Sequence, residues 1–278
     1  MINFLHTFEP QRIFISLGWL QIYYYGLFIV LGILLGIFMI NKIISYYPKN
    51  LQIEKEIIID LCFWTILSGI LGARLYHVFL EFNYYIQNPI NIFKIWNGGI
   101  AIHGAILSGG ITLFYLARKY KINLLFLGAV SSVGLSIGQA IGRFGNYFNQ
   151  ELFGLPTDRP WGIPISIENR PDIFKEFEFF HPTFLYESLG SFLIFLILIL
   201  GHYLIIKKKQ IHDFSFLIII NIYFIFYSLL RFFLEFIRID HTLIFAGLRW
   251  PQIISLLIIF FSILVSFLLI KYKNYVKK

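Results

Sequence analysis

The stretch LLFLGAVSSVGLSIGQAIGRFGNYFNQELFG, residues 124–154, joins a long apolar run to a dense polar cluster. Residues 124–142 form the apolar part, and a helix of about 20 such residues spans the roughly 30 Å hydrocarbon core of a membrane. The polar part follows immediately and contains Arg143, Asn146, Asn149, Gln150 and Glu151. Because polar groups are costly on a membrane-buried scaffold, this stretch predicts both a membrane fold and a functional site.

The composition of the whole chain supports a membrane fold. Of its 278 residues, 58% are hydrophobic and only 14% are charged, which is far from the composition of an ordinary soluble domain. Seven apolar runs are long enough to cross a bilayer, namely residues 18–44, 57–80, 98–117, 124–142, 183–206, 214–237 and 252–270. We therefore predict an all-α polytopic membrane protein with seven transmembrane helices, built as a single integral membrane domain over residues 1–278.

The charges between the apolar runs predict the orientation of the chain. If the amino terminus lies outside, the cytoplasmic segments carry thirteen Lys and Arg residues and the outer segments carry eight. The positive-inside rule then places the amino terminus outside and the carboxyl terminus in the cytoplasm. The basic residues form short clusters without interleaved stacking aromatics, so the net charge of +8 does not predict nucleic-acid binding.

One long segment, residues 143–182, separates the fourth and fifth apolar runs on the predicted outer side. It contains five prolines, Pro156, Pro160, Pro164, Pro171 and Pro182. Proline interrupts helices because it lacks a backbone N–H and clashes with the preceding turn. We therefore expect a structured extramembrane insertion without long helices.

Cysteine and histidine usage argues against metal chemistry and cofactors. Cys62 is the single cysteine, and it lies inside an apolar run, where burial keeps a thiol protonated and unreactive. The seven histidines are too scattered to form a metal pair at helical spacing. We predict no metal and no cofactor. The first 17 residues also lack the basic start and short apolar core of a removable signal peptide.

The sixth apolar run carries charged residues at helical spacing. Tyr227, Arg231, Glu235 and Arg238 follow one another at intervals of four, four and three residues, which places them on one stripe of a helix. Charged groups inside a membrane face the bundle interior or a polar cavity. One interpretation is an ion pair between Arg231 and Glu235 that only locks helices together. The other is that Arg231 binds a phosphate, whose geometry suits a guanidinium fork, with Glu235 orienting it or a second arginine.

Two further positions have both a functional and a structural interpretation. His103 lies among small residues in NGGIAIHGAILSGG, where a substrate could approach an imidazole suited to proton transfer near neutral pH. A lone histidine on an apolar face is more often a structural core residue. Arg143 lies at the carboxyl end of a helix, where the helix dipole already favours a cation. The helix dipole does not explain why two further polar residues, Asn146 and Glu151, follow Arg143 so closely in the sequence.

These elements together resemble the bacterial prolipoprotein diacylglyceryl transferase family, and the resemblance covers nearly the whole chain. The most specific segments are GRFGNYFNQELFG at residues 142–154 and HPTFLYE at residues 181–187. RFFLEFIR at residues 231–238 and GGIAIHG at residues 98–104 also match. Two short segments also match, Tyr25-Gly26 and Gly72-Ala73-Arg74, but alone they are weak evidence for the family.

The resemblance implies a lipid-transfer reaction on the outer face of the membrane. The diacylglyceryl group of phosphatidylglycerol would pass to the lipobox cysteine thiol of a preprolipoprotein, releasing glycerol 1-phosphate. The partners would be phosphatidylglycerol, the signal peptides of preprolipoproteins and the lipid bilayer. Because the substrate supplies the thiol, this reaction needs no nucleophilic cysteine in the enzyme.

The resemblance also implies roles for individual residues. Arg143 and Arg231 would bind the phosphoglycerol group and stabilise its departing charge, and His103 would be the general base or a positioning group. The headgroup and the arginines would be held by Asn146, Glu151, Tyr227, Glu235 and Arg238, with Tyr25 lining the same cavity. His181 and Glu187 are expected to anchor the insertion to the fifth helix, with a catalytic role as the alternative.

A different functional class is a multi-pass anion transporter or channel with an arginine-lined cavity. Such a protein is typically built from two related halves with broken helices, and the sequence contains no such halves. The resemblance implies the inner membrane of a bacterial cell. Frequent Ile, Phe, Lys, Tyr and Asn indicate an AT-biased genome, so a plastid membrane is the alternative location.

Overall fold

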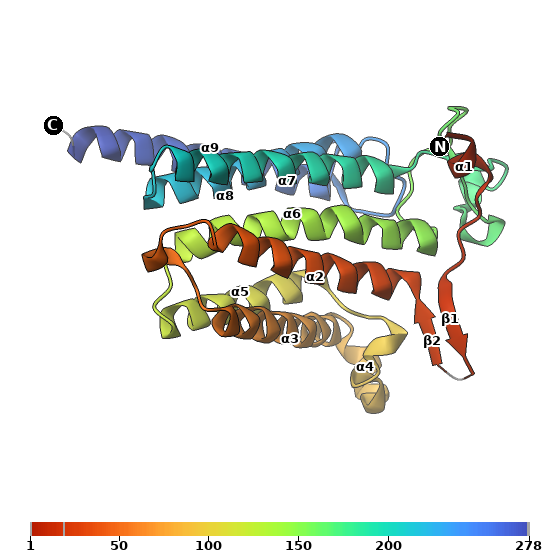
Figure 1. Cartoon of the computed structure of the whole chain (residues 1–278). Coiled ribbons are helices and arrows are strands. Elements are labelled where there is room, and N and C mark those ends of the chain that lie inside the picture. Colours follow the sequence, from red (N-terminus) through yellow and green to blue (C-terminus); the bar gives the residue numbers. More distant parts are fainter. Residues whose placement is uncertain (1, 19, 277–278) are drawn as a thin grey trace. The chain divides into compact units, whose positions relative to one another are not determined.

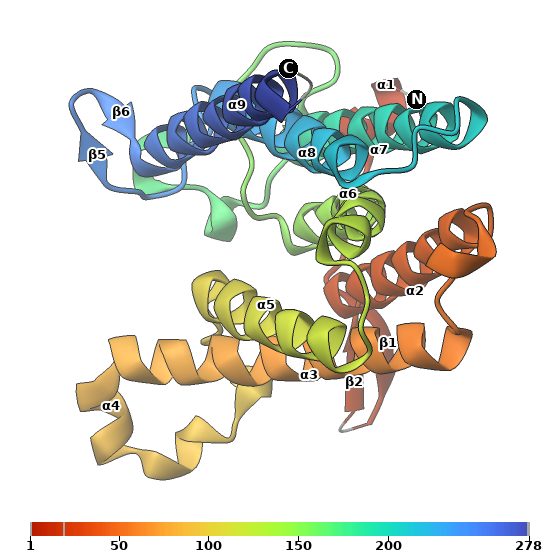
Figure 2. The same cartoon turned by 90° about the vertical axis from the view of Figure 1, so that its left-hand side faces the viewer.

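The computed structural model describes residues 2–18 and 20–276. The chain forms two compact units, one comprising Met1–Ile43 with Gly128–Lys278 and the other Ile44–Leu127. Figures 1 and 2 show that long helices make up most of both units. The single-domain organisation of the chain stays a prediction.

Seven long helices occur at the seven predicted apolar runs. They are α2 (Tyr24–Ile44), α3 (Lys55–Leu80), α5 (Ile102–Lys119), α6 (Leu124–Asn149), α7 (Thr183–Lys207), α8 (Asp213–Leu234) and α9 (Trp250–Val276). Within the described residues, six segments are long and apolar enough to cross a membrane, and α5 is not among them. The predicted all-helical membrane class is confirmed at this level. Polar and basic residues such as His103, Arg118 and Lys119 make α5 less apolar than the other six.

The first unit contains α2, α6, α7, α8 and α9. Figures 1 and 2 show α6 between α2 and the helices α7 and α8. Glycines allow the close contact of α2 and α6, because a Cβ atom at Gly36 would lie 2.9 Å from the backbone oxygen of Gly134. Ser188 of α7 donates a hydrogen bond to the backbone oxygen of Ala140 in α6 at 2.7 Å. Small residues and interhelical hydrogen bonds are the usual means of packing helices in membranes.

The beginning of the first predicted span is not helical. Strand β1 (Ile13–Leu17) pairs antiparallel with β2 (Leu20–Tyr23), and α2 begins only at Tyr24. Gly18 has a φ of 61°, which glycine adopts without steric cost and which the hairpin turn requires. The third predicted span is likewise shorter than expected, because Gly98 and Gly99 have positive φ angles and α5 begins at Ile102.

The ends of the fourth and sixth runs also differ from the prediction. Helix α6 continues to Asn149, so the first seven residues of the expected insertion are helical. Helix α8 ends at Leu234, and Arg238 therefore lies beyond the helix rather than on its stripe. Arg238 instead forms an isolated β-bridge with Gly154 of the insertion. Of the four residues of the predicted stripe, Tyr227 and Arg231 lie on α8, and Glu235 directly follows its last residue. Only Arg238 lies away from the helix.

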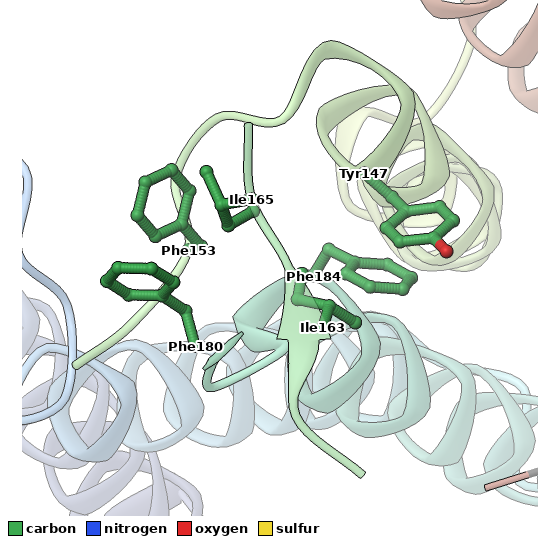
Figure 3. Close-up of a cluster of buried hydrophobic side chains, with 6 residues drawn as sticks. All are labelled: Tyr147, Phe153, Ile163, Ile165, Phe180 and Phe184. Carbon is green, nitrogen blue, oxygen red and sulfur yellow. The ribbon is translucent and has the colours of Figure 1, made fainter. Parts of the chain in front are cut away.

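Residues 150–182 fold on the end of α6 and the beginning of α7. They contain the short strands β3 (Ile163–Pro164) and β4 (Phe179–Phe180) and two single 3-10 turns (Ile167–Asn169 and Asp172–Phe174). The segment has its own core, shown in Figure 3, made by Tyr147, Phe153, Ile163, Ile165, Phe180 and Phe184. Helix α1 (Ile2–Thr7) contacts β3. The remaining hairpin of the unit pairs β5 (Ile244–Phe245) with β6 (Leu248–Arg249) before α9.

The second unit is built on the packing of α3 against α5. Gly72 of α3 and Gly104 of α5 lie so close that a Cβ atom at either position would collide with the backbone of the other helix. Ser108 donates a hydrogen bond to the backbone oxygen of Ser68 at 2.7 Å. The connection from α3 to α5 contains α4 (Phe82–Gln87) and two 3-10 turns (Pro89–Ile92 and Ile95–Asn97). A third 3-10 turn, Lys49–Leu51, precedes α3.

Candidate active site

The centre of the candidate site is Glu187, on the first turns of α7. Its Oε1 lies 2.7 Å from Nη2 of Arg143 on α6, and its Oε2 lies 3.3 Å from Nη1 of Arg231 on α8. The hydroxyl of Tyr227 also donates to Oε1 at 3.4 Å. The Glu187 side chain is 2% exposed, whereas those of Arg143 and Arg231 are 23% and 17% exposed. The carboxylate is therefore buried, while the side chains of both arginines are partly exposed.

A second buried carboxylate, Glu235, extends the network. It follows the last residue of α8 and is fully buried. Its Oε2 accepts a hydrogen bond from Nη2 of Arg231 at 2.9 Å, and its Oε1 lies 3.0 Å from Nε of Arg249. Nε of Arg238 is 3.8 Å from Oε2. Arg231 is thus held by two carboxylates, one from each side.

The segment after α8 supplies a third carboxylate. Asp240 pairs with Arg238 at 2.7 Å and with Arg249 at 3.7 Å. Arg249 also donates hydrogen bonds to the backbone oxygens of Arg238 and Asp240. Burial raises the pKa of Asp240, but the hydrogen bond and charge of Arg238 and the charge of Arg249 outweigh burial, so this pKa is lowered from its ordinary value.

The ion-paired network has an excess of positive charge. Seven residues are joined by ion pairs, namely Arg143, Glu187, Arg231, Glu235, Arg238, Asp240 and Arg249. Four arginines and three carboxylates leave one positive charge. A guanidinium group has five N–H donors, so an arginine that pairs with a carboxylate retains donors for a further anion. The arginines of the network can therefore donate to an anion as well as to their carboxylate partners.

The predicted polar cluster at the end of α6 divides into two parts. Arg143 donates to Oδ1 of Asn146 at 3.3 Å, and Asn146 in turn donates to Glu151 at 2.7 Å. These residues continue the network. Tyr25 of α2 lies against the same stretch of α6, because a Cβ atom at Gly145 would be 2.8 Å from its ring.

The other part of the cluster holds the insertion in place. The side-chain oxygen of Gln150 accepts hydrogen bonds from the backbone N–H of Ser166 at 2.7 Å and from Asn169 at 3.0 Å. Gln150 itself has a φ of 52°, which reverses the chain direction after α6. Further along, the N–H of Leu155 donates to the backbone oxygen of Ile237 at 2.8 Å. The insertion is therefore tied directly to the segment that carries Arg238.

His181 takes part in the same attachment of the insertion. Its backbone exchanges hydrogen bonds with Gly154 and Leu155, and its Nδ1 lies 3.1 Å from the hydroxyl of Tyr186. Trp161 of the insertion donates to that hydroxyl at 2.7 Å. Burial and the positive charge of Arg159 lower the pKa of His181. These contacts agree with the predicted anchoring role.

His103 belongs to the second unit, so the structure does not join it to the arginine network. It is the second residue of α5, its side chain is exposed, and its ring centroid lies 6.0 Å from that of Tyr76. The loop before it is fixed by Arg74, which donates to the backbone oxygens of Ile92 at 2.8 Å and Gly98 at 2.7 Å. The part that His103 plays in the chemistry stays a prediction.

Comparison with known proteins identifies the family. The model of the family described as Prolipoprotein diacylglyceryl transferase matches residues 12–268. The chain belongs to this family. Among curated relatives, phosphatidylglycerol–prolipoprotein diacylglyceryl transferases from Synechococcus elongatus and Fervidobacterium nodosum are 40% and 39% identical, covering 92% and 88% of this chain and 86% and 80% of theirs. The enzyme of that name from Prochlorococcus marinus subsp. pastoris is 37% identical over 97% of this chain and 95% of its own.

The predicted family and the predicted enzyme class, a transferase, are therefore confirmed, and the transporter alternative is not favoured. The structure brings together all the predicted site residues of the first unit. Sequence reasoning missed Arg249 and Asp240, and it favoured a structural role for Glu187 over a catalytic one. Glu187 carried a usable signal, because it lies within a predicted span, where charged residues are usually functional. Arg249 lies just before the last predicted span, with no spacing that relates it to Glu235.

Proposed function

We propose that this protein transfers the diacylglyceryl group of phosphatidylglycerol to the lipobox cysteine of preprolipoproteins. The proposal rests chiefly on the meeting of Arg143 and Arg231, from two different helices, at one buried carboxylate. Membership of the transferase family supports the same reaction. The partly exposed side chains of Arg143 and Arg231 would bind the phosphate of the lipid headgroup.

The reaction is a substitution at carbon. The sulfur of the cysteine forms a bond to the glycerol carbon that carries the phosphate, and the carbon–oxygen bond to the phosphate breaks. The bonding electrons leave with the oxygen, so glycerol 1-phosphate departs and a thioether remains. The phosphate gains a second negative charge as this bond breaks. Preorganised donors aimed at a developing charge lower the barrier, and we assign this role to Arg143 and Arg231, which meet at Glu187.

The thiol must lose its proton before or during the attack, because the thiolate is the nucleophile. We assign this step to His103, as general base or as the group that positions the thiol. Its place among glycines at the beginning of α5 supports close approach of a peptide. Asn146 and Glu151 would bind the glycerol headgroup and Tyr25 would line the cavity beside them. Tyr227, Glu235 and Arg238 would hold the headgroup and the two arginines in place.

We further propose seven membrane spans with the amino terminus outside and the carboxyl terminus in the cytoplasm. In this arrangement α5 is the additional span. Residues 143–182 then lie at the outer surface of the membrane. The bacterial origin of the curated relatives supports the inner membrane of a bacterial cell, with a plastid membrane as the alternative.

A reconstituted reaction tests the proposed function. The purified protein is mixed with phosphatidylglycerol and a lipobox peptide, and the products are analysed by mass spectrometry. We expect a diacylglyceryl thioether on the cysteine and an equal amount of glycerol 1-phosphate. A peptide with serine in place of the lipobox cysteine is the matched control and should stay unmodified. Absence of the thioether, under conditions where a curated relative forms it, would refute the proposal.

A further inference from the structure

We infer that Glu187 is the positioning residue that sets the spacing of the two arginines during catalysis. The inference rests on the proposed function, because it concerns how Arg143 and Arg231 act together on the lipid phosphate. Glu187 is the one residue of the ion-paired network that contacts both of them, one through each carboxylate oxygen. The three residues come from the three consecutive helices α6, α7 and α8.

The buried and the exposed residues of the site have different roles. Glu187 is 2% exposed, so the lipid cannot displace it without opening the helix bundle. Arg143 and Arg231 keep exposed parts, and these can contact a phosphate while the other parts stay bound to Glu187. Two positive charges side by side repel each other, and the carboxylate between them removes this repulsion. Glu187 therefore lets two guanidinium groups converge where one phosphate can reach both.

The neighbouring contacts make Glu187 rigid in this position. Tyr227 of α8 donates to Oε1 at 3.4 Å, and Nη1 of Arg238 lies 3.8 Å from Oε2. Both oxygens of the carboxylate are therefore engaged. Glu235, the other buried carboxylate, forms an ion pair with Arg231, and among the described residues it forms none with Arg143. Within the described network, alignment of the two arginines thus depends on Glu187.

This role predicts a particular kinetic signature. A residue that binds substrate directly would raise KM when it is lost, whereas misalignment of groups needed mainly in the transition state lowers kcat. A misplacement of about 1 Å at such a site can cost about 100-fold in rate. We therefore expect Glu187→Gln to lower kcat about 100-fold while KM for phosphatidylglycerol does not rise.

The test compares kcat, KM and thermal stability for wild type, Glu187→Gln, Glu187→Asp and Ser188→Ala in the reconstituted reaction. Glu187→Asp keeps the charge but is shorter by one methylene group, so it cannot reach both arginines equally. It should fold well and lose about 10-fold in kcat. Ser188→Ala removes a hydrogen bond between α7 and α6 next to Glu187 without changing any charge. It should lower Tm and leave kcat and KM unchanged.

Three results would overturn the inference. One is a kcat of either Glu187 variant within about threefold of wild type, measured per folded molecule. The second is a rise in KM at unchanged kcat, which would make Glu187 a substrate-binding group. The third is a loss of kcat in Ser188→Ala as large as in Glu187→Asp, which would make the effect one of helix packing. Wild type that forms no thioether would instead refute the proposed function, and with it the inference.

Discussion

Arg74 and Arg231 are both arginines within long apolar helices, yet their surroundings differ. Arg74 is 6% exposed and donates only to backbone oxygens of residues 91–99 in the described structure, including those of Gly98 and Gly99 at 2.7 and 2.6 Å. Arg231 contacts two buried carboxylates and stays 17% exposed. The neutral oxygens engage the donors of Arg74 and fix a loop. Arg231 has two carboxylate partners, and its side chain also stays partly exposed, so an anion could reach it.

The difference teaches that a charge inside a membrane is not by itself a sign of substrate binding. The cost of placing an arginine in an apolar helix can be offset by structural hydrogen bonds alone. The kind of partner and the remaining exposure distinguish the two cases. Substitutions in the two units can test this distinction directly.

The largest effect is expected from removing the side chain of Arg143 or of Arg231. Arg143→Ala and Arg231→Ala should each lower turnover by at least about 100- to 1000-fold, because each removes a donor to the developing charge on the phosphate. The protein should still insert into the membrane. Product formation by mass spectrometry, normalised to membrane-inserted protein, measures this effect. Near-normal turnover in either variant would remove that arginine from the mechanism.

His103→Gln should have the next largest effect on rate. General acid–base groups typically contribute about 100- to 10,000-fold, so we expect kcat to fall about 100-fold with little change in KM for phosphatidylglycerol. Steady-state kinetics over both substrates measure the change. His212→Gln is a suitable control, since His212 caps the start of α8 at the end opposite Arg231. Unchanged kcat in His103→Gln would show that the second unit does not supply the base.

Arg74→Ala should affect stability more than substrate affinity. The substitution leaves several backbone oxygens without their charged donor, and each such hydrogen bond contributes about 1.5–3 kcal/mol. We expect Tm to fall and the α4–α5 connection to become susceptible to protease, while KM for phosphatidylglycerol stays unchanged in the folded fraction. A large rise in KM without loss of Tm would contradict the structural role. It would also mean that Arg74, like Arg231, contributes to substrate binding.

The smallest effect concerns the pH dependence of Asp240. Its pKa is lowered from the ordinary value of 3.8, so the charged form stabilises the folded state at pH values above that. This contribution disappears as pH falls through the lowered pKa of the folded state. Wild type should therefore exceed Asp240→Asn in Tm at pH 7, and the difference should vanish in strong acid. Thermal unfolding in detergent between pH 7 and pH 2 measures it. A difference independent of pH would mean that Asp240 acts through packing and not through charge.

Much of the fold was predictable, because apolar length alone locates helices in a membrane protein. The exceptions have local causes. Leu20–Tyr23 belongs to the first predicted span, but it pairs with β1 and forms strand β2. Helix α6 continues past Gly142 because Arg143 and Asn146 are compatible with helix once their side chains have partners. Hydropathy does not report such partners.

The candidate site was predictable where its residues share a helix. The spacing of Tyr227, Arg231 and Glu235 predicted that these three side chains lie close together, and they do so at the end of α8. The contacts of Glu187 with Arg143 and of Glu235 with Arg249 join separate elements, and no periodicity in the sequence encodes them. Arg238 was expected on the helix, but α8 ends before it. It belongs to the network because the following chain pairs with Gly154 of the insertion.

The ion-paired network also bears on how the protein is made. In chain order its members are Arg143, Glu187, Arg231, Glu235, Arg238, Asp240 and Arg249, and their signs alternate without exception. After Arg143, each new charge of the network therefore follows a residue of opposite sign as synthesis proceeds. The accumulated charge of these seven residues never exceeds one unit at any length of the nascent chain. A charge that would be costly singly in an apolar helix thus has an oppositely charged partner earlier in the chain from α7 onward.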